Sequence, residues 1–126
     1  ERTFACFLDE VRGMGLGIAI TEMDIADRGG PQAIEPRDAQ VAAVGKAFLD
    51  VALDNPATSS VLTWGLSDRY SWLSTYPEYR WPDGKPSRGL PLDSDLRRKR
   101  LWAAMAAAFD AAPTRRASNQ GEGVPV

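Results

Sequence analysis

The stretch Gly15-Leu-Gly-Ile-Ala-Ile-Thr-Glu-Met-Asp-Ile25 decides the fold expected of this chain. It is a short apolar run with β-branched residues that ends abruptly in two carboxylates, a pattern typical of a buried parallel strand. A carboxylate after such a run is costly to bury without a partner, and a position at the mouth of a cleft relieves that cost. We therefore predict a strand over 16–25 with Glu22 and Asp24 at its carboxyl end.

The flanking sequence alternates helical and strand patterns. The predicted elements are a helix over 1–12, the strand, a loop over 26–36, a helix with Asp38 as its N-cap that ends at Asn55-Pro56, a strand over 60–67, an irregular segment over 68–93 and a last helix marked by Leu96 and Leu101 that ends near Pro113. This order predicts an α/β fold with a parallel sheet.

Two strands that are apolar on both faces do not make a domain, so we expect further strands from upstream sequence or from partner chains. The first helix has no cap before it, and we expect the natural polypeptide to begin further upstream. Residues 1–112 are expected to belong to one catalytic domain, and residues 113–126 are expected to form a disordered tail.

Composition excludes several classes of function. The 126 residues are 44% hydrophobic and 25% charged with a formal net charge of -2, which gives no electrostatic case for binding nucleic acid or an anionic membrane. No segment has the roughly 20 apolar residues of a membrane span. Cys6 stands alone and histidine is absent, so the sequence offers neither an intrachain disulfide nor a zinc site, and we expect no metal or organic cofactor. The basic run 97–100 is interpreted as the solvated start of a helix.

Three ordered motifs resemble the family 10 glycoside hydrolases, which are endo-1,4-β-xylanases. Gly15 to Ile25 is similar to the nucleophile signature at the end of that family's seventh barrel strand, with Met23 where leucine is usual. The segment Thr63-Trp-Gly-Leu-Ser-Asp-Arg-Tyr-Ser-Trp72 is similar to the eighth strand and the loop after it. A weaker match, from Leu90 to Trp102, resembles the lead into the last helix, with Arg98 and Arg100 where prolines are usual.

The resemblance implies the C-terminal segment of a (β/α)8 TIM barrel, from helix 6 to helix 8 with strands 7 and 8. It implies a retaining hydrolase that cleaves the β-1,4 bonds of xylan, with xylan or xylooligosaccharide as its ligand and Glu22 as its nucleophile. The acid/base glutamate and the histidine that orients the nucleophile are expected in strands that this sequence does not contain. Most such enzymes are exported, so a secreted or periplasmic parent enzyme is expected.

Trp64 and Trp72 match the tryptophans that shape the family's sugar pocket, and flat indole rings suit the apolar faces of pyranose sugars. If the strands stay regular, Glu22 shares a face with Ile18 and Ile20. By the same alternation, Trp64 shares a face with Asp68. Thr21 and Asp24 are candidates for positioning Glu22, although a structural ion pair is the favoured interpretation of Asp24.

Other polar and aromatic residues are assigned structural roles. Asp68, Arg69 and Tyr70 are interpreted as loop anchors, and Tyr76 and Trp81 as loop packing. Two alternatives remain open for the function: another retaining β-glycosidase or β-1,4-glucanase of similar fold, and a catalytically silent fragment that binds saccharide or associates with itself or other chains.

Overall fold

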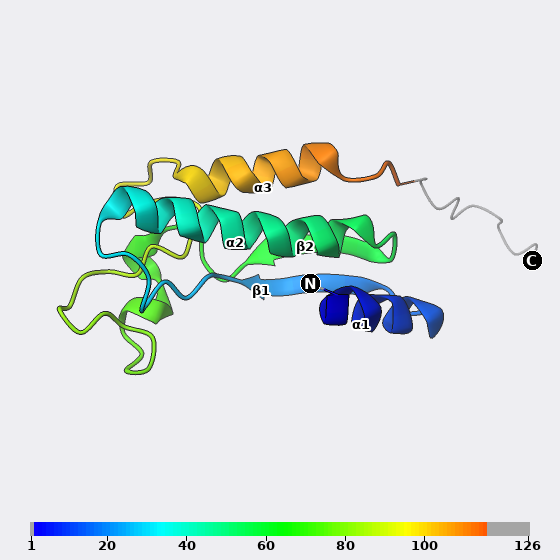
Figure 1. Ribbon diagram of the computed structural model, residues 1–126, viewed down its shortest axis with the longest axis horizontal. Coiled ribbons are helices and arrows are strands. Elements are labelled where there is room, and N and C mark those ends of the chain that lie inside the picture. Colours follow the sequence, from blue (N-terminus) through cyan, green and yellow to red (C-terminus); the bar gives the residue numbers. More distant parts are fainter. Residues whose placement is uncertain (1, 116–126) are drawn as a thin grey trace, which may run out of the picture.

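The computed structural model describes residues 2–115, and Figure 1 shows helices lying alongside a narrow sheet. The elements in chain order are α1 (Arg2–Gly13), β1 (Ile18–Met23), α2 (Ile34–Asp54), β2 (Thr58–Thr63), two 3₁₀ turns (Asp68–Tyr70 and Trp72–Ser74) and α3 (Arg100–Ala111). The predicted alternation of helices and strands is confirmed. Of the expected disordered tail, residues 116–126 lie outside the described residues.

β1 and β2 form a two-stranded parallel sheet, and α2 is the crossover helix between them. Because the strands are parallel, their carboxyl ends lie at the same end of the molecule. Figure 1 shows the β1–α2 and β2–α3 connections gathered at that end, on the left. The helices α2 and α3 pack against each other along their length. The long connections therefore share one end of the fold with the residues that leave both strands.

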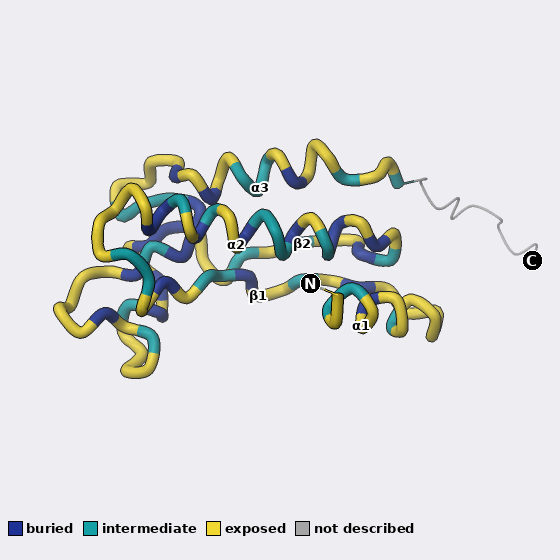
Figure 2. Tube along the Cα trace, viewed as in Figure 1, coloured by how far each residue is buried: buried dark blue, intermediate teal, exposed yellow. Residues whose placement is uncertain are grey.

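Two apolar clusters hold the helices to the sheet. The larger lies between β1, α2 and α3 and contains Met23, Val41, Leu49, Leu53, Leu101 and Ala108. The smaller attaches α1 and contains Leu8, Ile18 and Ala52. Figure 2 shows buried positions recurring along α2, as expected for a helix that covers a core on one side. A Cβ added at Gly45 would lie 2.5 Å from Leu101, so glycine permits the close packing of α2 on α3.

β1 carries an irregularity directly before its carboxyl end. The pairs on either side of it are Ile20 with Val61 and Met23 with Thr63. β1 thus advances three residues while β2 advances two, which is the count of a β-bulge. Met23 is consequently buried in the core and Glu22 is exposed. The expectation that Glu22 shares a face with Ile18 and Ile20 is wrong, because the extra residue breaks the alternation.

The second strand is also displaced from its prediction, since it begins at Thr58 and ends at Thr63. The following 3₁₀ turn carries Asp68 into the interior, where it is 1% exposed, while Trp64 is 52% exposed. The expectation that these two residues share a strand face is therefore wrong.

Both later helices begin at residues other than those predicted. α2 begins at Ile34, after Ala33, and Asp38 lies inside the helix rather than at its cap. Leu96 has a positive φ of 63° and belongs to the loop, so α3 begins only at Arg100. Asp38 pairs with Arg88 of the β2–α3 connection, and Lys99, the residue before α3, pairs with Asp68. Within residues 2–115, no helix combines the length and apolar character needed to cross a membrane.

Candidate functional site

Glu22 and Trp64 lie near one another at the carboxyl end of the sheet. The backbone N–H of Trp64 donates to the carbonyl of Met23 at 2.9 Å, which continues the strand pairing past the end of β2. Glu22 immediately precedes Met23, and both Glu22 and Trp64 are exposed. A carboxylate and an indole ring are thus presented where parallel β/α folds hold their reactive groups.

Trp72 is tied to the same strand end through Asp24. The indole Nε1 donates to Asp24 Oδ2 at 2.6 Å. Burial raises the pKa of Asp24, the hydrogen bond from Trp72 acts in the opposite direction, and the negative charge of Glu22 raises the pKa further. Among residues 2–115 no cation forms an ion pair with Asp24. The interpretation of Asp24 as a member of a structural ion pair is therefore wrong. Asp24 holds the ring of Trp72 instead.

A recess of about 540 Å³ borders Glu22 between β1 and α2. Residues 19–26 form one wall, and Val44, Gly45 and Phe48 of α2 form the other. Within the part of the chain that the structure describes, β1 pairs only with β2, so its other edge is free. Glu22 therefore stands beside a largely apolar recess with unpaired backbone groups next to it.

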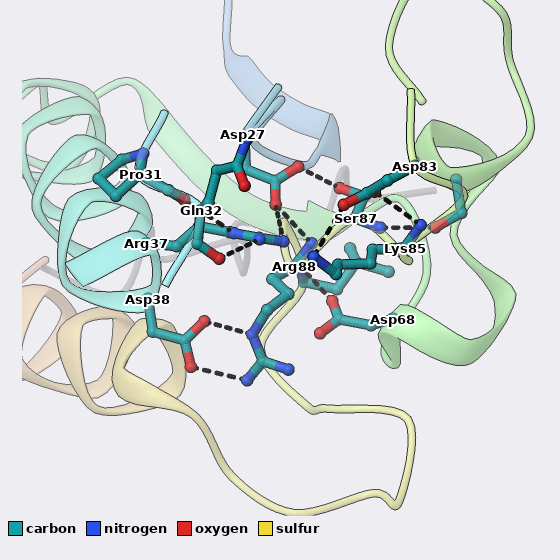
Figure 3. A network of polar contacts seen from close by, with 12 residues as sticks. Asp27, Pro31, Gln32, Arg37, Asp38, Asp68, Asp83, Lys85, Ser87 and Arg88 are labelled. Atoms are coloured by element: carbon teal, nitrogen blue, oxygen red, sulfur yellow. Dashed lines mark hydrogen bonds and ion pairs between the residues drawn. The ribbon is translucent and has the colours of Figure 1, made fainter. Parts of the chain in front are cut away.

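A network of buried polar contacts fixes the connections that carry these side chains, and Figure 3 shows it. Asp27, which follows β1, accepts hydrogen bonds from Ser87 Oγ at 2.7 Å and from the backbone N–H of Arg88 at 2.9 Å. Arg37 of α2 lies 3.6 Å from the same carboxylate and donates to the carbonyls of Pro31 and Gln32. The β1–α2 connection is thereby joined to the later β2–α3 connection.

Two further ion pairs extend this network. Arg88 makes a bidentate pair with Asp38, at 2.6 and 2.7 Å. Lys99 Nζ lies 2.7 Å from Asp68 Oδ2, and the two side chains are 4% and 1% exposed. Asp68 also accepts the backbone N–H of Leu90 at 3.1 Å. The interpretation of Asp68 as a loop anchor is confirmed.

Burial dominates the protonation of the Asp68–Lys99 pair. It raises the pKa of Asp68, and hydrogen bonds and positive charge from Lys99 oppose this only in part. Burial also lowers the pKa of Lys99, against the attraction of Asp68. For Arg88 the balance is reversed, because its hydrogen bonds to Asp38 raise its pKa. Burial thus disfavours the charged form of both Asp68 and Lys99, and the opposite charge of the partner offsets part of that cost.

A close backbone contact lies beside the network. Gly89 accepts the backbone N–H of Ile25 at 3.2 Å, and a Cβ added at Gly89 would stand 2.1 Å from the carbonyl oxygen of Ile25. Only glycine allows the two connections to approach this closely.

Several structural roles can now be assigned. Trp81 is 5% exposed and stacks under the guanidinium of Arg37 at 4.1 Å, so its role in loop packing is confirmed. Tyr70 is 78% exposed, and its assignment as a loop anchor is wrong. Lys99 is 8% exposed, so the solvated interpretation of the basic run is wrong at this position. Within residues 2–115, no cluster of three or more histidine, cysteine, aspartate or glutamate side chains is suited to a metal ion.

Comparison with known proteins assigns the chain to a family. Residues 1–108 match the family model described as Glycosyl hydrolase family 10. The chain belongs to this family. Over 68 residues this family 10 chain is 37% identical to endo-1,4-beta-xylanase B of Thermotoga neapolitana, a match that covers 52% of this chain and 19% of that relative.

Solved family 10 structures agree with this assignment. Native xylanase 10B from Thermotoga maritima matches with a TM-score of 0.70 and 28% identity, over 85% of this chain and 31% of that chain. Xylanase 10B from Thermotoga petrophila RKU-1, solved in complex with xylobiose, matches with a TM-score of 0.71 and 26% identity, again over 85% and 31%. The family is one of glycoside hydrolases built on a (β/α)8 barrel, and this chain spans about a third of the length of these solved relatives.

Proposed function

We propose that this chain is the C-terminal part of an endo-1,4-β-xylanase barrel, in which β1 and β2 are strands seven and eight and Glu22 is the nucleophile. The observation that carries the proposal is the exposed carboxylate of Glu22 at the end of β1, with Trp64 and Trp72 held at the same strand end. Family membership and the xylobiose bound to the Thermotoga petrophila relative support xylan as the substrate class.

Each side chain has a separate part in the proposed reaction. Glu22 attacks the anomeric carbon of the sugar, and a second carboxyl group about 5–5.5 Å away first donates a proton to the leaving oxygen and later activates water. That second group is supplied by sequence outside this chain, on strands that continue the sheet from the free edge of β1. The rings of Trp64 and Trp72 receive the apolar faces of the sugar beside Glu22.

Asp24 contributes through position and charge. Its hydrogen bond at 2.6 Å fixes the indole of Trp72, and its carboxylate lies close enough to Glu22 for the two charges to interact. A fixed ring beside the nucleophile orients the sugar before the reaction, which lowers the entropic part of the barrier. No metal or organic cofactor takes part in this scheme, and the parent enzyme is proposed to be secreted or periplasmic.

The isolated chain is expected not to hydrolyse xylan, because it lacks the acid/base that typically contributes about 10²–10⁴-fold to such reactions. Robust turnover by the purified chain would contradict the proposed division of roles. Comparison of products from xylan and from cellulose oligomers, made with a completed barrel, distinguishes a xylanase from the alternative of a β-1,4-glucanase.

The decisive experiment completes the barrel with a known relative. Residues 4–112 replace the matching segment of Thermotoga maritima xylanase 10B, and the chimera reacts with a slow 2-fluoro xyloside that accumulates as an enzyme ester. Peptide mass spectrometry should locate the sugar on Glu22. A label on Asp24 or Asp68 would refute the assignment.

A second arm of the experiment distinguishes a nucleophile from a structural glutamate. Glu22→Gly in the same chimera should remove ester formation, and azide should then attack an activated aryl xyloside to give a product of inverted configuration. The matched control is Asp24→Asn, which keeps Glu22 and should still form the ester. Residual retaining activity in Glu22→Gly, without any response to azide, would indicate a structural role.

A further inference from the structure

Three aromatic rings gather in the β2–α3 connection beside the proposed site. The ring of Trp72 meets Tyr76 edge-on at 5.4 Å and Tyr79 edge-on at 5.1 Å, and the two tyrosine rings stack at 5.8 Å with an interplanar angle of 30°. We call Trp72, Tyr76 and Tyr79 the aromatic triplet. Only Trp72 has a counterpart in the family motifs, so the two tyrosines are unexplained by the proposed catalytic machinery.

The triplet is not buried in the way that loop-packing aromatics are. Trp72 is 37% and Tyr76 is 48% exposed and Tyr79 is half-buried, whereas Trp81 in the same connection is 5% exposed and covered by Arg37. Exposed aromatic rings that adjoin one another leave apolar area in water, which folding alone does not favour. This arrangement is typical of a binding surface for a flat, partly apolar ligand.

Two contacts from the β1–α2 connection hold the triplet in place. Asp24 fixes the ring of Trp72 at 2.6 Å. Arg28 Nη1 donates to the carbonyls of Pro77 at 3.0 Å and Glu78 at 2.6 Å, so it fixes the backbone between the two tyrosines. Turn hydrogen bonds add to this restraint, because the backbone N–H of Tyr76 donates to the carbonyl of Trp72 and that of Tyr79 to the carbonyl of Tyr76, both at 3.0 Å. The rings are thus ordered before a ligand arrives, which reduces the entropy lost on binding.

We propose that Tyr76 and Tyr79 extend the sugar-binding surface of Trp72, so that the triplet receives a further pyranose ring of a neutral oligosaccharide. The chemistry fits, because aromatic faces receive the C–H faces of pyranoses while the tyrosine hydroxyls, which both donate and accept, reach sugar hydroxyls. The proposal deepens the proposed function and rests on it for the substrate class. It assigns to Tyr76 a part in specificity rather than in loop packing.

The test adds xylotriose to the full chain, at a protein concentration where light scattering shows a monomer, and records NMR spectra of the indole N–H groups and the tyrosine rings. The Trp72 indole resonance should shift saturably, and Tyr76→Ala should raise the Kd by about 3- to 10-fold. Tyr76→Phe, which keeps the ring and loses only the hydroxyl, should raise the Kd by less than Tyr76→Ala does. Tyr70→Ala is the matched control, because Tyr70 is a 78% exposed tyrosine of the same connection outside the triplet, and its Kd should not change.

A second readout needs no substitution and therefore does not depend on how a variant folds. Intermolecular nuclear Overhauser effects should join xylotriose protons to the ring protons of Tyr76 or Tyr79. Binding without such effects, an unchanged Kd in Tyr76→Ala, an equal loss in Tyr70→Ala, or no saturable shift at Trp72 would each overturn the proposal. Failure of the proposed function is distinguishable, because it is measured by the ester on Glu22 in the chimera and not by this titration.

Discussion

Replacement of Lys99 by methionine tests whether the buried network supports the site-bearing connections. Methionine preserves most of the apolar length of lysine but removes its charge, so the change leaves the carboxylate of Asp68 in the interior without its ionic partner. At 1% exposure the carboxylate cannot turn to water. Its remaining protein partner is the backbone N–H of Leu90 at 3.1 Å. We expect Lys99→Met to destabilise the fold.

The magnitude follows from the burial of the pair. Removing one member of a buried ion pair costs about 3–5 kcal/mol, whereas an exposed pair contributes about 0–1 kcal/mol. We expect a loss of about 3 kcal/mol for Lys99→Met, near the lower limit because the hydrogen bond from Leu90 remains. The double variant Asp68→Asn with Lys99→Met removes both charges, and we expect it to recover most of this loss.

The stability lost in Lys99→Met should also depend on pH, because Asp68 changes its charge with pH. The folded-state pKa of Asp68 is raised, so its contribution to stability is greatest below the unfolded pKa and is lost as the pH rises through the folded pKa. Lys99 lowers that pKa, and its removal moves the folded value further up. The cost of Lys99→Met should therefore be larger at pH 7 than at about pH 4.

Urea unfolding of the full chain, followed by circular dichroism at low protein concentration, measures these free energies. The matched control is Lys46→Met, the same substitution in the exposed Lys46–Asp50 pair, whose side chains are 42% and 46% exposed. It should cost less than about 1 kcal/mol. Equal losses for the two lysines, or a double variant no more stable than Lys99→Met, would refute the reasoning.

Three other predictions follow from the same structure. Gly89→Ala should lower the free energy of unfolding by about 1–3 kcal/mol, because the added Cβ would stand 2.1 Å from the carbonyl oxygen of Ile25. Gly13→Ala, whose added Cβ would meet no atom of another part of the chain within 4 Å, should cost far less in the same urea assay. Asp24→Ala should release the indole of Trp72, and NMR should show its N–H exchanging faster with solvent, whereas unchanged exchange would mean that the bond does not order the ring. The full chain should self-associate at high concentration, because Leu62 of β2 and Trp64 and Leu66 after it are more than half exposed and, within residues 2–115, the outer edge of β1 has no partner strand. Light scattering that shows a stable monomer would contradict this expectation.

The order of helices and strands could be predicted because it depends on local periodicity and on glycine and proline signals. The apolar run before Glu22 marked β1, and the stripe from Val41 to Phe48 marked α2. The irregularity before Met23 could not be predicted, because it depends on the register with β2. That register is set by packing between strands about 40 residues apart in sequence.

The buried network could not be predicted from the sequence, for a similar reason. Asp27 and Ser87 are separated by 60 residues, and nothing in either local sequence identifies the other as a partner. The sequence predicts Asp38 as a helix cap because aspartate favours that position, but α2 begins four residues earlier, at Ile34, and Asp38 pairs with Arg88 from within the helix. The sequence predicts Lys99 to be solvated because it stands in a basic run. Charge patterns in a sequence do not distinguish a paired interior charge from a surface charge.

The buried network has a consequence for the construction of hybrid enzymes. All of its ion pairs join residues between Asp27 and Lys99, so they are inherited together when this segment is moved as one block. A recombination crossover before Ile18 separates none of these partners. A crossover within α2, after Asp38, would part Asp27 from Ser87 and Asp38 from Arg88 and require the second parent to supply matching charges. Libraries of family 10 hybrids should therefore contain more folded members when their junctions avoid residues 27–99.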